Sequence, residues 1–178
     1  MSEGQIRYVK ETEVASIRKV FANLKISPKL AYVIVNKRIN SRFYAKKGTD
    51  FGNPPAGTVV DNCVTLPERY DFFVIPQNVR QGTVNPTSYN VIEVRTNLPF
   101  SCFPIKPTAA NYLLQDDTGF KPDQMQLFTY MMCHLYFNWP GTVKVPAVCQ
   151  YAHKLANLVG GNVHGQPSDR LADLLYYL

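Results

Sequence analysis

The sequence has 178 residues, enough for one domain of ordinary size or for a large part of a bigger one. Apolar residues make up 46% of it and charged residues only 18%, which predicts a packed core and more buried surface than an average domain has. A complete soluble domain with a good core is an equally acceptable interpretation of this composition. The formal net charge of +6 favours a polyanionic partner, because neutralised phosphates release condensed counterions.

The sequence argues against a membrane protein and against a secreted protein. The longest apolar run, Leu30–Val35, is far too short to cross a bilayer, so we expect no membrane partner. The first residues, Met1–Gln5, are polar and do not resemble a signal peptide.

The cysteines are scattered, without a pair at metal-ligand spacing: Cys63, Cys102, Cys133 and Cys149. Reduced thiols in a protein of the cytoplasm or the nucleus are the simplest interpretation.

The first half of the chain predicts a helix followed by strands. Apolar residues recur at helical spacing over Ile6–Leu24, and Ser27-Pro28 closes the helix. The run Leu30–Val35 predicts a central strand that is buried on both faces. Lys46–Gly57 is rich in glycine and proline and predicts a loop. Three further short strands are expected, at Thr58–Val60, Tyr70–Ile75 and Ser88–Glu93.

The second half predicts helices. Lys121–Phe137 is expected to be a helix with Pro122 in its first turn. Its expected apolar stripe consists of Met125, Leu127, Met131, Met132 and Leu135. Pro146 should open a last helix that ends near Val159, where Gly160-Gly161 stops it. Strands that alternate with helices predict the α/β class.

A series of motifs, in order along the chain, resembles the Argonaute proteins and their Piwi clade in particular. Ser2–Gln5 is similar to the end of the family's Asp-Gly-Val-x-x-Gly-Gln motif, and Val35–Phe43 to its basic motif after a strand. Other matching segments are Pro55–Asp61, Tyr70–Phe73, Gln81–Thr83, Leu127–Tyr136, Val145–Leu155 and Tyr176–Leu178. The resemblance implies that residues 1–178 are the C-terminal part of a PIWI domain, an RNase H-like α/β fold that is incomplete at its N-terminal side.

The resemblance also implies a catalytic chemistry for the parent family. Slicing members cut a target RNA paired to a guide, with two Mg²⁺ ions held by acids and a histidine. His153 stands at the position of that histidine, whereas the acids precede Ser2 in the family. A lone imidazole cannot hold two hard cations, so we expect no nuclease activity from this chain alone. His153 as a hydrogen-bonded structural residue is the alternative.

Four residues match family positions that contact the backbone of the guide RNA: Lys37, Arg42, Tyr136 and Gln150. Arg38 and Lys144 are additional candidates on charge alone. A solvated surface charge is the alternative for each basic residue. The chain departs from the wider Argonaute pattern at Asn138 and Gln150, where that clade has Arg and often Tyr, which weakens a guide contact at these two positions.

The last residue carries a further implication of the resemblance. In the Piwi clade the carboxylate of the final leucine helps to bind a metal ion at the guide's 5′ phosphate, and Leu178 ends this chain in the same way. A carboxylate oxygen suits Mg²⁺. A hydrophobic anchor made with Leu175, Tyr176 and Tyr177 is the alternative.

One segment, Val94–Gln115, does not match the family pattern. Its prolines break both helical and strand periodicity, and a structureless insertion of this size is uncommon in a compact domain. Its removal would join Ile92-Glu93 to Asp116-Asp117 and restore the family's run of strand, acidic turn and helix. We therefore expect a retained intron, which a cDNA that lacks the segment would support.

The leading functional prediction is a fragment of a piRNA-guided silencing protein, with guide RNA, target RNA and the protein partners of Piwi proteins as its partners. Two alternatives stay open. One is a non-catalytic fragment that engages RNA or a protein, and the other is a truncated product without a function.

Overall fold

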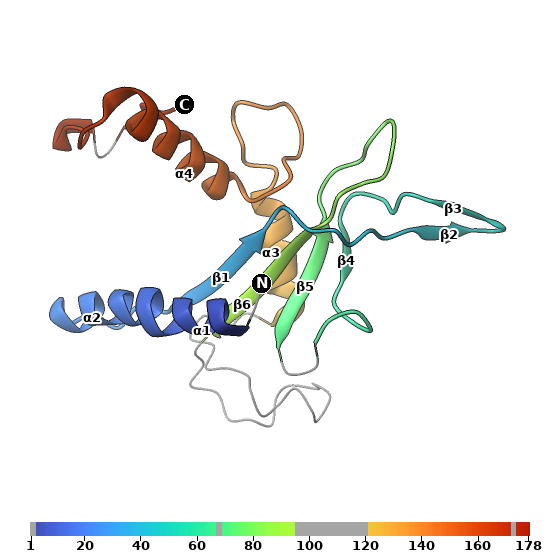
Figure 1. The fold of residues 1–178 in the computed structure, drawn as a ribbon, viewed down its shortest axis with the longest axis horizontal. Helices are drawn as coiled ribbons and strands as arrows, with labels where there is room; N and C mark the ends of the chain where they lie inside the picture. The colour runs from blue at the N-terminus through green and yellow to red at the C-terminus, as the bar shows by residue number, and fades with distance from the viewer. Residues whose placement is uncertain (1–2, 67–68, 95–120, 172–173) are drawn as a thin grey trace. The chain divides into compact units, whose positions relative to one another are not determined.

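The computed structural model describes residues 3–66, 69–94, 121–171 and 174–178. The segment predicted to be a retained intron therefore lies, beyond Val94, outside the described residues, and the intron stays a prediction. In chain order the elements are α1 (Glu3–Val9), η1 (Lys10–Val14), α2 (Ala15–Asn23), β1 (Ala31–Asn36), β2 (Ala45–Lys47), β3 (Asp50–Gly52), β4 (Thr58–Val60), β5 (Tyr70–Ile75), β6 (Thr87–Val94), α3 (Pro122–Met132), α4 (Ala147–Leu158), η3 (Val159–Val163) and η4 (Asp169–Leu171) (Figure 1).

Strands and helices occur in the mixture that the sequence predicts. Four strands form one sheet in the order β1-β6-β5-β4, and β2 and β3 form a two-stranded sheet of their own. Backbone contacts divide the chain into two compact units. Unit 1 comprises Met1–Asn36, Val60–Phe73 and Ser88–Asp123, and unit 2 comprises Lys37–Val59, Val74–Thr87 and Gln124–Leu178.

The first helix of unit 1 is interrupted by a π-helical turn. α1 and α2 are joined by η1, so that one helical segment runs from Glu3 to Asn23, close to the predicted range. Val9 and Val14 are its buried residues, and Glu13 of η1 accepts a hydrogen bond from the hydroxyl of Tyr32 on β1. This bond to a carboxylate raises the pKa of Tyr32 to about 12, with contributions from burial and from the charge of Glu13.

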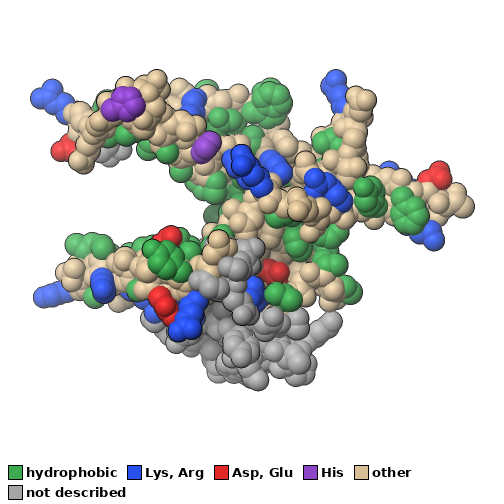
Figure 2. All heavy atoms as spheres, in the orientation of Figure 1, with side chains coloured by type: hydrophobic (Ala, Val, Ile, Leu, Met, Phe, Trp, Pro, Cys, Tyr) green, Lys and Arg blue, Asp and Glu red, His purple; other side chains and the backbone are tan. Residues whose placement is uncertain are grey.

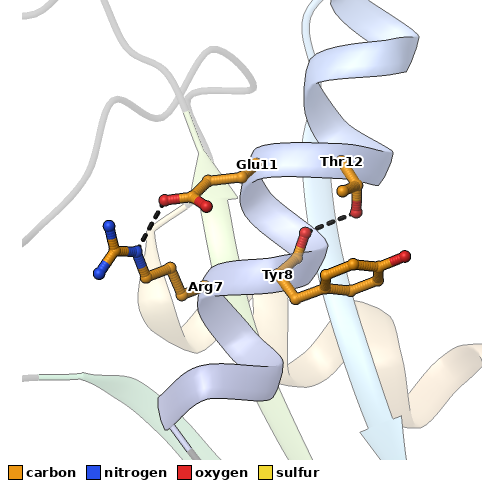
Figure 3. A network of polar contacts seen from close by, with 4 residues as sticks. All are labelled: Arg7, Tyr8, Glu11 and Thr12. Carbon is orange, nitrogen blue, oxygen red and sulfur yellow. Dashed lines mark hydrogen bonds and ion pairs between the residues drawn. The ribbon is translucent and has the colours of Figure 1, made fainter.

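The exposed side of the same helix carries short-range polar contacts. Arg7 Nε donates to Glu11 Oε1 over 2.7 Å, and the Thr12 hydroxyl donates to the carbonyl oxygen of Tyr8 (Figure 3). The Glu11 carboxylate raises the pKa of Arg7, mainly through the hydrogen bond. Exposed pairs of this kind contribute little to stability, so the buried valines hold this helix rather than its charges.

Two aromatic rings stack in the core of unit 1. Phe72 on β5 and Tyr89 on β6 are fully buried and stack with a ring-centroid distance of 5.1 Å and an interplanar angle of 7°. β1 pairs antiparallel with β6, with Ile34 opposite Asn90, and the register shifts between Tyr32 and Val33.

Four details of the sequence-based prediction are wrong. First, the run at Leu30–Val35 is not a central strand: β1 stands at the end of the strand order and its residues are half-buried. An apolar run shows that a strand is favourable, but not how many neighbours it has. Second, the predicted loop Lys46–Gly57 contains the β2–β3 hairpin. A positive φ of 63° at Gly48 allows the tight connection between its strands.

Third, α3 ends at Met132 rather than at Phe137. The N–H groups of Cys133 and His134 bond to carbonyl oxygens three residues earlier, and the Cys133 carbonyl instead accepts from Val143 N–H at 2.9 Å. Only Met125 of the expected apolar stripe is buried. Leu127, Met131 and Leu135 are exposed, and Met132 is half-buried.

Fourth, the two glycines after α4 do not stop the helix. The chain continues as η3 through Gly160 and Gly161 to Val163. It ends at His164, whose φ of 51° is left-handed and whose N–H bonds to Val159 O at 2.7 Å. This bond satisfies a terminal carbonyl as a glycine cap would.

The stacked pair predicts where unit 1 is most sensitive. Replacement of Phe72 by Ala should lower the free energy of unfolding by about 3–5 kcal/mol, because it leaves a cavity against Tyr89. Tyr8→Ala is the matched control, since Tyr8 is 64% exposed. Chemical denaturation of the three chains measures the difference, and equal losses in both variants would contradict this account of the core.

Candidate nucleic-acid interface

Three basic residues of unit 2 come from segments that are far apart in the sequence. Lys37 and Arg42 follow β1, and Lys144 lies in the loop between α3 and α4. Several Lys and Arg side chains gather in the middle of the face that Figure 2 shows, near the end of β1 and the loop between α3 and α4. The guanidinium of Arg42 donates from Nη1 to the carbonyl oxygens of Ile39 at 3.0 Å and Ser41 at 2.8 Å, which fixes its direction.

The backbone at Lys144 is held from inside the protein. The hydroxyl of Thr87, which is fully buried, donates to the carbonyl oxygen of Lys144 over 2.7 Å. Val143 and Val145 on either side are buried. Gln77 also donates to the carbonyl oxygen of Thr142. The side chain of Lys144 therefore extends from a fixed loop.

The three cations influence one another. Burial lowers the pKa of Lys144, and the charges of Arg42 and then Lys37 lower it further. Lys37 also acts on the Cys149 thiol, whose pKa burial raises while the lysine opposes the rise. Lys37 thus lies near the first turn of α4, where Cys149 is located.

No carboxylate neutralises this group within the part of the chain that the structure describes. Arg7 pairs with Glu11, whereas Lys37, Arg42 and Lys144 form no ion pair with a described residue. Neighbouring cations without a protein counterion provide a favourable place for an external anion. We call Lys37, Arg42 and Lys144 the basic cluster.

An aromatic group joins the C-terminal segment to α4. The ring of Tyr151 on α4 lies 5.1 Å from that of Tyr136 and 6.0 Å from that of Tyr177, centroid to centroid. The Tyr151 hydroxyl accepts from the Phe137 N–H at 2.8 Å and donates to the Leu135 carbonyl at 3.4 Å. Tyr151 therefore fixes both the segment that holds Tyr136 and the residues that precede Leu178.

The remaining predicted residues lie on or near the same helix. Gln150 is half-buried in the first turn of α4, and Leu178 is 42% exposed. His153 is exposed, one turn further on, and its Nε2 lies 3.5 Å from Asn157 Nδ2. Asn157 is therefore a hydrogen-bond partner for His153, as a structural role would require. The contact does not test the catalytic role.

The donor set around His153 does not fit the expected pair of Mg²⁺ ions. Among the described residues no three His, Cys, Asp or Glu side chains come together in a way that could hold a metal ion. Mg²⁺ takes oxygen ligands in octahedral geometry, and one imidazole supplies neither. The carboxylate of Leu178 is one suitable oxygen, but it also needs further ligands.

The candidate residues suggested by the sequence all lie in unit 2, but the sequence alone could not indicate which of them are close together. It did not identify Thr87 or Tyr151 as the residues that position the others. No motif spacing marks a hydroxyl that bonds to a distant carbonyl, so Thr87 has no signal in the sequence. Tyr151 had a weak one, because an aromatic residue next to Gln150 lies in a matched segment.

Comparison with known proteins decides the family. The Piwi domain model matches residues 1–100 and 103–164. The chain belongs to the Piwi domain family. It is 47% identical over 180 residues to the Piwi-like protein Siwi of Bombyx mori, a match that covers all of this chain and 18% of Siwi. It is 44% identical over 183 residues to the protein piwi of Drosophila melanogaster, covering all of this chain and 19% of piwi.

Solved structures agree with this assignment. The crystal structure of Drosophila Piwi matches with a TM-score of 0.74 and 42% identity, over 99% of this chain and 22% of that chain. Kluyveromyces polysporus Argonaute with a guide RNA matches with a TM-score of 0.73 and 22% identity, over 100% of this chain and 23% of that one, and shows the fold alone. The predictions of a Piwi-clade relationship and of an RNase H-like α/β fold from the C-terminal part of a PIWI domain are confirmed. The chain spans about a fifth of the length of these curated relatives.

The electrostatic contacts of Lys144 generate a prediction that needs no ligand. Replacement of Arg42 by Gln should raise the pKa of Lys144 towards its ordinary value of 10.5, because a cation that disfavours the protonated form is removed. An NMR pH titration of the Lys144 side chain measures the change. Arg80→Gln is the control, since Arg80 is an exposed arginine of unit 2 that contributes no shift to Lys144.

The lowered pKa of Lys144 also makes the free energy of unfolding depend on pH. Between the lowered pKa of Lys144 and 10.5 the unfolded chain binds more protons than the folded one, so this residue's contribution to the free energy of unfolding increases as the pH rises through that window. Arg42→Gln should flatten this increase. An unchanged Lys144 titration in the variant would contradict the proximity of the two side chains.

Proposed function

We propose that the basic cluster and the residues next to it bind the sugar-phosphate backbone of a small guide RNA, as part of a piRNA-guided silencing protein. The observation that carries the proposal is the group of three neighbouring cations, Lys37, Arg42 and Lys144, without an ion-pair partner among the described residues. Burial lowers the pKa of Lys144 and the charges of Arg42 and Lys37 lower it further, and a phosphate bound there would offset that repulsion.

Polar side chains complete the proposed contact. Tyr136 supplies a hydroxyl from a segment that Tyr151 fixes, and Gln150 supplies an amide from the first turn of α4. The N-terminus of this 12-residue helix carries the positive end of its dipole, which also favours phosphate oxygens. Contacts of this type position a strand without reading its sequence, as a protein that accepts many guides requires.

Proteins of similar fold are described with nucleic acids, which supports a nucleic-acid partner. The Argonaute of Kluyveromyces polysporus is described with a guide RNA, and that of Clostridium butyricum with a guide DNA and a target DNA. We propose guide RNA and target RNA as the partners of this chain's parent protein, and silencing of transcripts or transposons as its role. The protein partners of Piwi proteins and a place in the cytoplasm or the nucleus belong to the same proposal. No helix in the described residues is long and apolar enough to span a membrane.

Backbone binding predicts a defined salt dependence. Arg42→Gln should weaken binding of single-stranded RNA and reduce the slope of log K against log salt by about 0.7, as expected when one phosphate contact to a single strand is lost. Lys37→Gln should do the same. Arg80→Gln is the matched control, and fluorescence anisotropy at several salt concentrations measures all four chains. Equal slopes in the cluster variants and the unchanged chain would contradict the proposal.

We further propose that residues 1–178 by themselves do not cleave RNA, since the donors around His153 do not fit two Mg²⁺ ions. The purified chain, incubated with Mg²⁺, a guide and a complementary target, should give no more product than Mg²⁺ alone. His153→Ala should be indistinguishable from the unchanged chain. Cleavage that disappears in His153→Ala would overturn this proposal and leave the binding proposal intact.

A further inference from the structure

The β2–β3 hairpin is a small ribbon with its own register. Its strands are antiparallel, with Lys46 opposite Phe51 and Lys47 opposite Asp50, and they form a two-stranded sheet of their own (Figure 1). Isolated ribbons of this kind are marginally stable in water, so their side chains are normally packed against something.

The base of the hairpin is fixed within unit 2. Asn53, which follows β3, donates from Nδ2 to the carbonyl oxygen of Gly82 at 2.8 Å. Its Oδ1 accepts from the Val84 N–H at 3.1 Å. On the other strand, the hydroxyl of Tyr44 lies 3.4 Å from the Thr83 hydroxyl oxygen. Both sides of the hairpin therefore contact the same short loop, which gives the ribbon a defined direction.

Large aromatic side chains on this fixed ribbon face solvent. Phe51 is 71% exposed and Tyr44 is 57% exposed. Lys46 lies directly opposite Phe51, so the two side chains share one face of the ribbon. Figure 2 shows hydrophobic side chains along the hairpin, with charged side chains near its tip. Two large exposed aromatic side chains and a lysine thus lie together on a ribbon whose direction is fixed.

We propose that Tyr44, Lys46 and Phe51 form a stacking surface for unpaired RNA bases. Aromatic rings interleaved with cations are the combination by which proteins hold single strands: the rings stack on bases and the cations meet phosphates. Two observations favour RNA over another occupant. Lys46 gives the surface the complementary charge, and Arg42 of the basic cluster precedes Tyr44 by only two residues, so the cluster and the hairpin adjoin along the chain. This inference rests on the proposed RNA-binding function and extends it from phosphates to bases.

A titration of the full chain with a short fluorescent oligouridine tests the proposal. Phe51→Ala should weaken binding about tenfold, because stacking of a base on a side chain is lost. Its salt slope should not change, because no ionic contact is removed. Tyr44→Ala should behave similarly, because a second ring is lost. Tyr8→Ala is the matched control, an exposed tyrosine removed from unit 1.

An abasic strand of the same length separates stacking from other effects. It keeps the phosphates and lacks the bases, so Phe51→Ala should bind it as tightly as the unchanged chain does. Unchanged oligouridine binding in Phe51→Ala would overturn the proposal, and so would an equal loss for the two strands. If Arg42→Gln still lowers the salt slope in that case, the hairpin proposal fails and the backbone-binding function stands. If no chain binds RNA, both fail.

Discussion

Electrostatic repulsion among three side chains is the constraint on which the proposed function depends. A folded protein gains nothing from holding Lys37, Arg42 and Lys144 near one another: burial lowers the pKa of Lys144 most, and the charges of Arg42 and Lys37 lower it further. The fold nevertheless secures the arrangement with strong local contacts. The buried hydroxyl of Thr87 holds the backbone of Lys144, and two carbonyl oxygens hold Arg42. A binding site that is organised before its ligand arrives loses less entropy when the ligand binds.

The same principle applies at the C-terminal segment. Tyr151 uses its ring to contact Tyr136 and Tyr177, and its hydroxyl to bond to the backbone of the loop after α3. One side chain of α4 thereby fixes two segments that carry predicted ligand-binding residues. Neither Thr87 nor Tyr151 needs to touch RNA to matter for binding. Both belong to the layer of residues that hold binding groups in place.

Much of the fold could be predicted from the sequence because its signals are local. β4, β5 and β6 are short runs rich in β-branched and aromatic residues between turns, and α4 begins directly after Pro146. The predictions failed where a tertiary contact decides. α3 ends early because the Cys133 carbonyl bonds to Val143 rather than within the helix, and the glycine-rich segment around Gly48 forms a hairpin whose base is anchored by Asn53. The candidate site was found by resemblance, residue by residue. The proximity of Lys144 to Arg42 could not be inferred, since it depends on how distant segments pack.

The π-helical turn in the first helix has a consequence for how this segment tolerates changes of length. Val9 and Val14 are five residues apart, and in a regular α-helix they would point about 140° away from each other. Hydrogen bonds from i to i+5 in η1 accommodate one additional residue, so both valines reach the core. Loss of a single residue between them would restore the ordinary spacing of four and still leave both on one side. A chain shorter by one residue at this point can therefore keep the same buried valines. A one-residue gap here in an alignment would mark the loss of the π-helical turn, not a shift of the whole helix.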